Sequence, residues 1–140
     1  MVVLVIEDCI DTYLLIKNSL QPIEILHASR ISEAKDLLDK HRPHLILIDV
    51  DLPDGNGVDF CSELSTDPKN SEIPRIILTA KSETADKIYG LYSGADDYIT
   101  KPFEAQELVL KVINILKERK RAAKSKETYV KHIQSYPMVA

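Results

Sequence analysis

Five short apolar runs alternate along the chain with stretches whose apolar residues recur at helical spacing. The apolar runs, rich in β-branched residues, are 2–6, 23–27, 45–48, 75–78 and, more weakly, 98–100. The helical stretches are 14–20, 31–38, 58–64, 85–92 and 108–116. The run 45–48 is apolar at every position, as expected of a strand that is buried on both faces. The pattern therefore predicts a strand-helix unit that is repeated five times.

Strands that are joined by single helices run parallel, with right-handed crossovers. The predicted fold is therefore an α/β protein with a five-stranded, doubly wound parallel sheet, (βα)5. A chain of 140 residues corresponds to one domain that can bury a core without disulfides. In open sheets of this kind, ligands bind at the carboxyl ends of the strands, where the strand order reverses. Residues that follow the strands are thus the first candidates for a functional site.

The composition, 44% hydrophobic and 29% charged, is typical of a globular chain. The sequence has neither an apolar run long enough to span a membrane nor a signal peptide. Cys9 and Cys61 form no disulfide framework or zinc spacing, so we expect both to pack and the setting to be reducing and cytoplasmic. The histidines show no ligand spacing either, and a surface or capping role is expected for His27.

The charge is unevenly distributed. Residues 1–116 hold 11 basic and 20 acidic residues, a net charge of −9, whereas 117–140 hold 7 and 2, a net charge of +5. The acidic body argues against direct nucleic-acid binding. We predict a domain over 1–121 and a basic tail or linker over 122–140, with the last helix running past the body. The tail is either a solvated helix end or a dock for an acidic partner, with an apolar stripe at Tyr129, Val130, Ile133 and Tyr136. The sequence is either a stand-alone domain or a piece of a longer chain, and we expect the stand-alone form.

Polar side chains follow four of the five predicted strands: Glu7 and Asp8, Asp49, Thr79, and Lys101. Because the carboxyl ends of parallel strands meet at one edge, these side chains should converge. Clustered carboxylates repel one another and need a cation, and oxygen ligands with open positions suit Mg²⁺. A lysine and a hydroxyl would bind the remaining oxygens of a phosphoryl group. A carboxylate among them can act as a nucleophile that forms an acyl phosphate.

Four segments carry a resemblance to a known family: Val5-Ile6-Glu7-Asp8, the stretch 45–57, Ile77-Leu78-Thr79-Ala80 and the stretch 94–103. With them, the sequence resembles the receiver domain of two-component response regulators over residues 2–118, with the flavodoxin-like fold of chemotaxis regulators. The resemblance implies a phosphorylation-activated signalling switch. Asp49 would accept a phosphoryl group from a sensor histidine kinase or a phosphotransfer protein. Such a domain catalyses only its own phosphotransfer and autodephosphorylation.

The resemblance implies Mg²⁺ as the cofactor. Its ligands would be Glu7, Asp8, Asp49 and the backbone carbonyl of Asp51. Asp8 would bind the ion directly, and Glu7 would act through water. The pair is Glu-Asp rather than Asp-Asp, a variation that we expect to be compatible with metal binding.

The resemblance also assigns the groups that contact and sense the phosphoryl group. Thr79 and the backbone N–H of Ala80 would bond its oxygens, and Lys101 would pair with it and sense its charge. Tyr98 would be the aromatic switch residue, which turns inward as Thr79 moves. The Lys101–Pro102 peptide bond is expected to be cis.

The output surface that the resemblance implies consists of the helical stretch 85–92, the strand 98–100 and the helix 108–116. Phosphorylation would change this surface to control a partner, and it would promote a two-fold homodimer there. Residues 86–98 resemble the dimerising receivers of transcription-factor-type regulators. Lys111 stands where an arginine is expected, and lysine cannot make the bidentate contact, so weaker ion pairing is expected.

Two variable positions should flank the phosphoryl group. Asp51 comes two residues after the acceptor, and Lys81 comes two residues after Thr79. Their opposite charges either form an ion pair that hinders water or stay solvated and unlinked.

Two alternatives remain beside the signalling switch. Asp49-Val50-Asp51 resembles the Asp-x-Asp motif of haloacid-dehalogenase-type phosphatases, which also use an aspartyl nucleophile and Mg²⁺. Those enzymes place the motif at their first strand, and Pro53 sits where their motif requires Thr or Val. The other alternative is a receiver-like binding module that is not phosphorylated. A phosphorylation test separates it from the switch.

Overall fold

The computed structural model describes residues 1–80 and 93–134, with side chains up to residue 126. The helices are α1 (Ile10–Ser19), α2 (Ile31–Lys40), α3 (Gly57–Ser65) and α5 (Ala105–Gln134). The longer strands are β1 (Val2–Ile6), β2 (Glu24–Ala28), β3 (Leu45–Asp49), β6 (Arg75–Thr79) and β7 (Asp97–Thr100). The predicted helical stretch 85–92, Lys81 and the side chains of the predicted stripe at Tyr129, Val130, Ile133 and Tyr136 lie outside the described residues.

The five longer strands form one parallel sheet in the order β2-β1-β3-β6-β7. The chain moves outward from β1 to β2, then returns across β1 to β3 and continues to β6 and β7. The strand order therefore reverses between β1 and β3, which places the ligand-binding edge at their carboxyl ends. The predicted five-stranded, doubly wound parallel sheet is confirmed.

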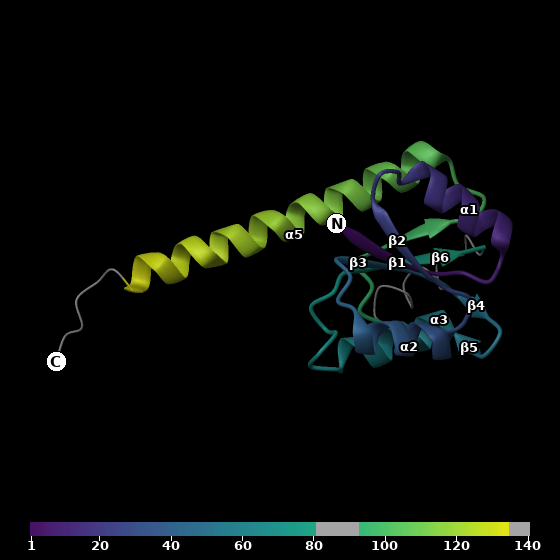
Figure 1. Ribbon diagram of the computed structural model, residues 1–140, viewed down its shortest axis with the longest axis horizontal. Helices are drawn as coiled ribbons and strands as arrows, with labels where there is room; N and C mark the ends of the chain where they lie inside the picture. The colour runs from purple at the N-terminus through teal and green to yellow at the C-terminus, as the bar shows by residue number, and fades with distance from the viewer. Residues whose placement is uncertain (81–92, 135–140) are drawn as a thin grey trace.

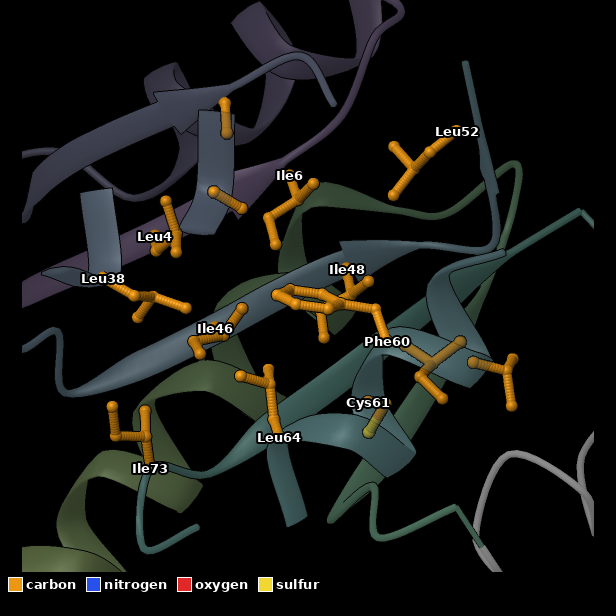
Figure 2. Close-up of a cluster of buried hydrophobic side chains, with 14 residues drawn as sticks. Leu4, Ile6, Leu38, Ile46, Ile48, Leu52, Phe60, Cys61, Leu64 and Ile73 are labelled. Carbon is orange, nitrogen blue, oxygen red and sulfur yellow. The ribbon is translucent and has the colours of Figure 1, made fainter. Parts of the chain in front are cut away.

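Helices cover both faces of the sheet, with α2 and α3 on one face and α1 and α5 on the other (Figure 1). Alternate residues of β1 point to opposite faces, so Leu4 and Ile6 pack towards α2 and α3, whereas Val3 and Val5 pack towards α1 and α5. Figure 2 shows the first of these two cores, in which the ring of Phe60 lies between side chains of the sheet and those of the helices. The two cores hold the sheet rigid beneath its carboxyl edge.

A short hairpin directly after β3 was not predicted. Its strands, β4 (Asp51–Leu52) and β5 (Gly55–Asn56), pair antiparallel. Each strand has two residues, too few for the alternation by which a strand is recognised in a sequence. The hairpin lies between the strand that carries Asp49 and the start of α3.

The last helix, α5, runs from Ala105 to Gln134 and projects far beyond the sheet (Figure 1). This agrees with the expectation that the helix continues past the domain body. The helix passes through residues 121 and 122 without a break, so the boundary placed there stays a prediction. Where α5 leaves the sheet, Arg119 contacts Asp96, the residue before β7, at 3.3 Å. Among the described residues, no helix combines the length and the apolar character that a membrane span requires.

The two cysteines lie in different environments. Cys61 is buried in the core beneath α3, as expected. Cys9 is exposed, and the expectation that it packs was wrong. It occupies the position just before α1, where the chain leaves the sheet edge and its side chain has no core to face.

Candidate functional site

An acidic cluster lies at the carboxyl edge of β1 and β3. These strands pair in parallel with Ile6 opposite Ile48, so the residues that follow, Glu7 and Asp49, come side by side. Oxygens of Glu7, Asp8 and Asp49 all lie within 4.8 Å of one another. Glu7 is 0% exposed and Asp49 is 6% exposed, whereas Asp8 is exposed. The sheet thus brings together the three acids that the sequence singled out.

Lys101 completes the cluster from the position directly after β7, the edge strand on the other side of β6. Its Nζ lies 2.6 Å from Oε1 of Glu7 and 3.2 Å from Oδ1 of Asp49. The backbone N–H of Lys101 donates to the carbonyl of Thr79 at 2.7 Å, which ties the end of β7 to the end of β6. The peptide bonds Gln21–Pro22 and Lys101–Pro102 are both cis. Among the described residues, one lysine therefore contacts two of the three clustered carboxylates, which leaves this part of the site with an excess of negative charge.

The pKa of Glu7 reflects both its burial and this excess of negative charge. Burial first, and then the neighbouring Asp49, raise the pKa of Glu7 from its ordinary 4.5 to about 7, although Lys101 opposes the rise. Burial acts to lower the pKa of Lys101, but the hydrogen bond to Glu7 and the charge of Asp49 raise it above its ordinary value. The protein therefore holds Lys101 charged and makes ionised Glu7 costly.

The cluster fits a divalent cation. Oε2 of Glu7 is buried and has no hydrogen-bond partner among the described residues, although a buried oxygen normally has one. Three carboxylates with ligand atoms close together are a donor set that Mg²⁺ accepts. A bound cation would satisfy the orphaned oxygen and offset the repulsion between the acids.

The hydroxyl and aromatic residues of the predicted site lie on the neighbouring strands. Thr79 is buried at the end of β6 and pairs with Thr100 of β7, while Ala80 follows in an exposed bend. Tyr98 is half-buried on β7 and packs against the core beneath α2 and α3. The ammonium of Lys111 lies 5.2 Å from the centre of the Tyr98 ring. Thr79 and Tyr98 are therefore placed two residues apart along paired strands.

The residues after Asp49 include one position where a side chain cannot fit. A Cβ added to Gly57 would lie 1.9 Å from the backbone oxygen of Asp49. The N–H of Gly57 donates to the carbonyl of Val50 at 2.8 Å. Asp51 is exposed on β4, and its proposed partner Lys81 lies outside the described residues, so their pairing stays a hypothesis.

His27 takes part in the support of Glu7, which the sequence did not suggest. The ring of His27 is half-buried and stacks on Tyr13, with centroids 3.6 Å apart and planes 10° from parallel. Its Nε2 lies 2.8 Å from the backbone oxygen of Glu7. A surface or capping role was expected, and the half-buried ring contacts a backbone oxygen at the end of β1 while it packs against α1. A lone histidine without ligand spacing carries no sequence signal for such a contact.

A flavodoxin-like sheet with acids at its switch point defines the class of the receiver domains. The family model of the response regulator receiver domain matches residues 3–113. The chain therefore belongs to the response regulator receiver domain family, a family of phosphorylation-activated signalling switches. The match leaves the phosphatase alternative without support, and Asp49 ends the third strand rather than the first.

Relatives with known names agree with this. Histidine kinase P4 of Formosa agariphila is 40% identical over 132 residues, which are 94% of this chain and 10% of that protein. The phosphate regulon transcriptional regulatory protein PhoB of Escherichia coli is 39% identical over 105 residues, which are 75% of this chain and 44% of PhoB. The chain thus spans less than half the length of these relatives.

Solved structures show the same fold. A putative response regulator from Chloroflexus aurantiacus superposes with a TM-score of 0.78 at 33% identity, over 82% of this chain and 96% of that one. The chemotaxis response regulator CheY4 of Vibrio cholerae superposes with a TM-score of 0.76 at 25% identity, over 81% of this chain and 97% of that one. The match to nearly the whole of both chains confirms the chemotaxis-regulator-like fold.

Proposed function

We propose that this chain is a Mg²⁺-dependent phosphorylation switch and that Asp49 is its phosphoacceptor. The observation that carries the proposal is the place of Asp49, at the end of a buried strand and 3.2 Å from Lys101. Two further acids, Glu7 and Asp8, share its site. The phosphoryl donor is a histidine kinase or a phosphotransfer protein, because the family's acceptor receives its phosphoryl group from phosphohistidine.

In the proposed reaction, an oxygen of ionised Asp49 forms a bond to phosphorus while the bond from phosphorus to the donor imidazole breaks. The electron pair leaves with the imidazole nitrogen, and the product is an acyl phosphate. Such a transfer needs positioning and neutralisation of charge on three phosphoryl oxygens. Lys101 supplies one positive charge beside the acceptor. The hydroxyl of Thr79 and the N–H of Ala80 supply donors from the end of β6.

The clustered acids are the proposed ligands of the cation. Glu7, Asp8, Asp49 and the backbone carbonyl of Asp51 would hold Mg²⁺, which would neutralise phosphoryl charge when bound. The buried, unpartnered Oε2 of Glu7 supports this assignment. Glu7 does not need to contact the ion itself, because a water can bridge a carboxylate to Mg²⁺.

Phosphorylation then acts on the surface around β7 and α5. The added charge draws Lys101 away from Glu7, and Thr79 moves towards the phosphoryl group. Tyr98 fills the space that Thr79 leaves. The contact of Lys111 with the ring and carbonyl of Tyr98 would carry this change to α5. The helical stretch 85–92, the third part of the proposed output surface, lies outside the described residues.

A phosphorylation-driven homodimer at this surface is part of the proposal. In the single chain, Lys111 contacts Asp97 at 3.4 Å and Glu107 at 3.8 Å. These half-exposed ions can exchange their partners for those of a second copy. Sedimentation with and without beryllofluoride, a phosphoryl mimic, tests this. A dimer with the mimic that Asp97→Ala abolishes is expected, whereas two monomeric samples would contradict it.

Asp51 and Lys81 are proposed to lengthen the lifetime of the acyl phosphate. If they pair across the site and hinder water, Asp51→Asn and Lys81→Ala each hasten hydrolysis, and the double variant is less than additive. Strictly additive rates of hydrolysis would mean that the two residues act independently.

Intact-mass measurement tests the proposed function. Acetyl phosphate with Mg²⁺ should add one phosphoryl group to the wild-type chain, and a chelator should stop the reaction. Asp49→Asn should abolish the addition, while the control Asp36→Asn, at an exposed position of α2, should retain it. A wild-type chain that gains no phosphoryl group would favour the non-phosphorylated binding module instead.

A further inference from the structure

The carboxylate of Asp54, in the turn of the β4–β5 hairpin, lies on the N-terminus of a distant helix. Its Oδ1 accepts the N–H of Ile31 at 2.8 Å, and its Oδ2 accepts the N–H of Ser32 at 3.0 Å. The first N–H groups of a helix have no partner within the helix. The residue at the N-cap position of α2, Arg30, makes no side-chain cap. A residue 22 to 23 positions further along the chain therefore caps α2.

The same hairpin also caps the helix that follows it. The side chain of Asn56 accepts the N–H of Val58 at 2.7 Å, at the start of α3. On the other side of the turn, Gly55 packs closely against α2, since a Cβ there would lie 2.9 Å from Cδ1 of Ile31. The hairpin is thus fastened to the ends of two helices.

These fastenings matter because the hairpin is too short to hold its own position. An isolated two-stranded hairpin is marginal at best in water, and this one has two residues in each strand. Asp51 pairs with Asn56 and Leu52 pairs with Gly55. On one side of Asp51, the backbone of Val50 is bonded to Leu78 and Gly57. On the other side, the backbone of Asp51 is held by what holds the second strand and the turn.

Asp54 is chemically suited to this task and separate from the acidic cluster. The two backbone hydrogen bonds, first from Ile31 and then from Ser32, lower the pKa of Asp54, so the carboxylate stays charged at neutral pH. A negative charge at a helix N-terminus interacts favourably with the helix dipole. Among the described residues, the clustered acids that could hold a metal are Glu7, Asp8 and Asp49. Asp54 does not belong to this cluster.

We propose that Asp54 is a positioning residue for the cation site: by capping α2 from the hairpin turn, it holds the Asp51 carbonyl where the ion needs it. This inference rests on the proposed function, which assigns that carbonyl to Mg²⁺. Asp54 does not contact the ion or the phosphoryl group. It acts through the two paired strands, as outer residues of metal sites commonly act on the ligands.

The test is a Mg²⁺ titration of four proteins by calorimetry: the wild type, Asp54→Ala, Asp54→Asn and Asp36→Ala. Asp54→Ala should weaken Mg²⁺ binding about tenfold, the lower range for loss of a residue that supports a ligand. Asp54→Asn should lose less, because its amide oxygen can still accept one of the two N–H groups. Asp36, exposed on the same helix, is the matched control, and its variant should bind as the wild type does.

Two readouts separate positioning from a general loss of structure. Amide exchange without Mg²⁺ should quicken at Ile31 and Ser32 in Asp54→Ala, while the core strands β1 and β3 keep their protection. Phosphorylation by acetyl phosphate should slow at low Mg²⁺ and recover at saturating Mg²⁺, since the chemical groups are unchanged.

Wild-type Mg²⁺ affinity in Asp54→Ala, together with faster exchange at Ile31 and Ser32, would overturn the inference. If Asp54→Ala does not fold, the same comparison is made with Asp54→Asn, for which unchanged Mg²⁺ affinity with faster exchange would overturn it as well. A wild-type chain that binds no Mg²⁺ would instead contradict the proposed function.

Discussion

The ammonium of Lys101 lies closer to Glu7, at 2.6 Å, than to the proposed acceptor Asp49, at 3.2 Å. Glutamate has one methylene more than aspartate, which lets the carboxylate of the first strand reach the lysine of the last. Before phosphorylation, Lys101 therefore serves mainly as the counterion of a fully buried acid. Its release from Glu7 is the first event expected when charge is added at Asp49.

Lys101→Ala should separate phosphorylation from its consequence. The variant should still accept a phosphoryl group, about 100-fold more slowly, because one charge-stabilising donor is lost. It should fail to show phosphorylation-dependent protection of β7 and α5 in hydrogen exchange. Lys17→Ala, on α1, is the control and should behave as the wild type does. Normal protection in phosphorylated Lys101→Ala would show that the lysine is not the sensor.

Glu7→Gln should stabilise the Mg²⁺-free protein, with a gain that depends on pH. The pKa of Glu7 is about 7 in the fold and 4.5 ordinarily, so ionisation costs folding free energy above pH 4.5, and this cost is complete above pH 7. Glutamine avoids this cost, which amounts to about 3 kcal/mol. The gain should be largest at pH 8, shrink as the pH falls through 7 and vanish below 4.5.

Urea unfolding at several pH values measures this gain. Glu33→Gln is a control of opposite sign, because hydrogen bonds from Ser29 lower the pKa of Glu33. That variant should lose stability at neutral pH and regain it in acid. A stability difference for Glu7→Gln that does not change with pH would refute a raised pKa.

Mg²⁺ affinity should depend on pH through the same carboxyl group. Below pH 7 the ion must displace the proton of Glu7, so affinity should rise about tenfold per pH unit and level off above pH 7. Calorimetry in two buffers of different ionisation enthalpy counts the released proton. Glu7→Gln should abolish most of this dependence, and an unchanged slope in that variant would assign the proton to another group.

Gly57→Ala should destabilise the fold and disturb Asp49. The new Cβ would lie 1.9 Å from the backbone oxygen of Asp49, a rigid atom that cannot yield without moving β3. We expect a loss of about 2–4 kcal/mol in urea unfolding, as for other severe steric changes. Ser62→Ala, at an exposed position of α3, should cost less than about 0.5 kcal/mol. Equal losses in the two variants would contradict the steric requirement.

The sequence was sufficient to predict that Glu7, Asp8, Asp49 and Lys101 converge, because the carboxyl ends of parallel strands share one edge. It could not predict that Lys101 would lie nearer to Glu7, since that depends on side-chain lengths across three strands. The cap that Asp54 provides was equally hidden, because a cap on α2 from 22 residues away leaves no local pattern. The stack of His27 on Tyr13 arises only when α1 folds over β2.

The most direct test of the switch is to identify the residue that carries the phosphoryl group. Borohydride reduces an acyl phosphate of aspartate to homoserine, which peptide mass mapping then locates. After treatment with acetyl phosphate and Mg²⁺, homoserine is expected at position 49, and at no other acid of the cluster. Homoserine at position 8 or 51, or a phosphorylated chain that yields none, would contradict the assignment of Asp49 as the phosphoacceptor.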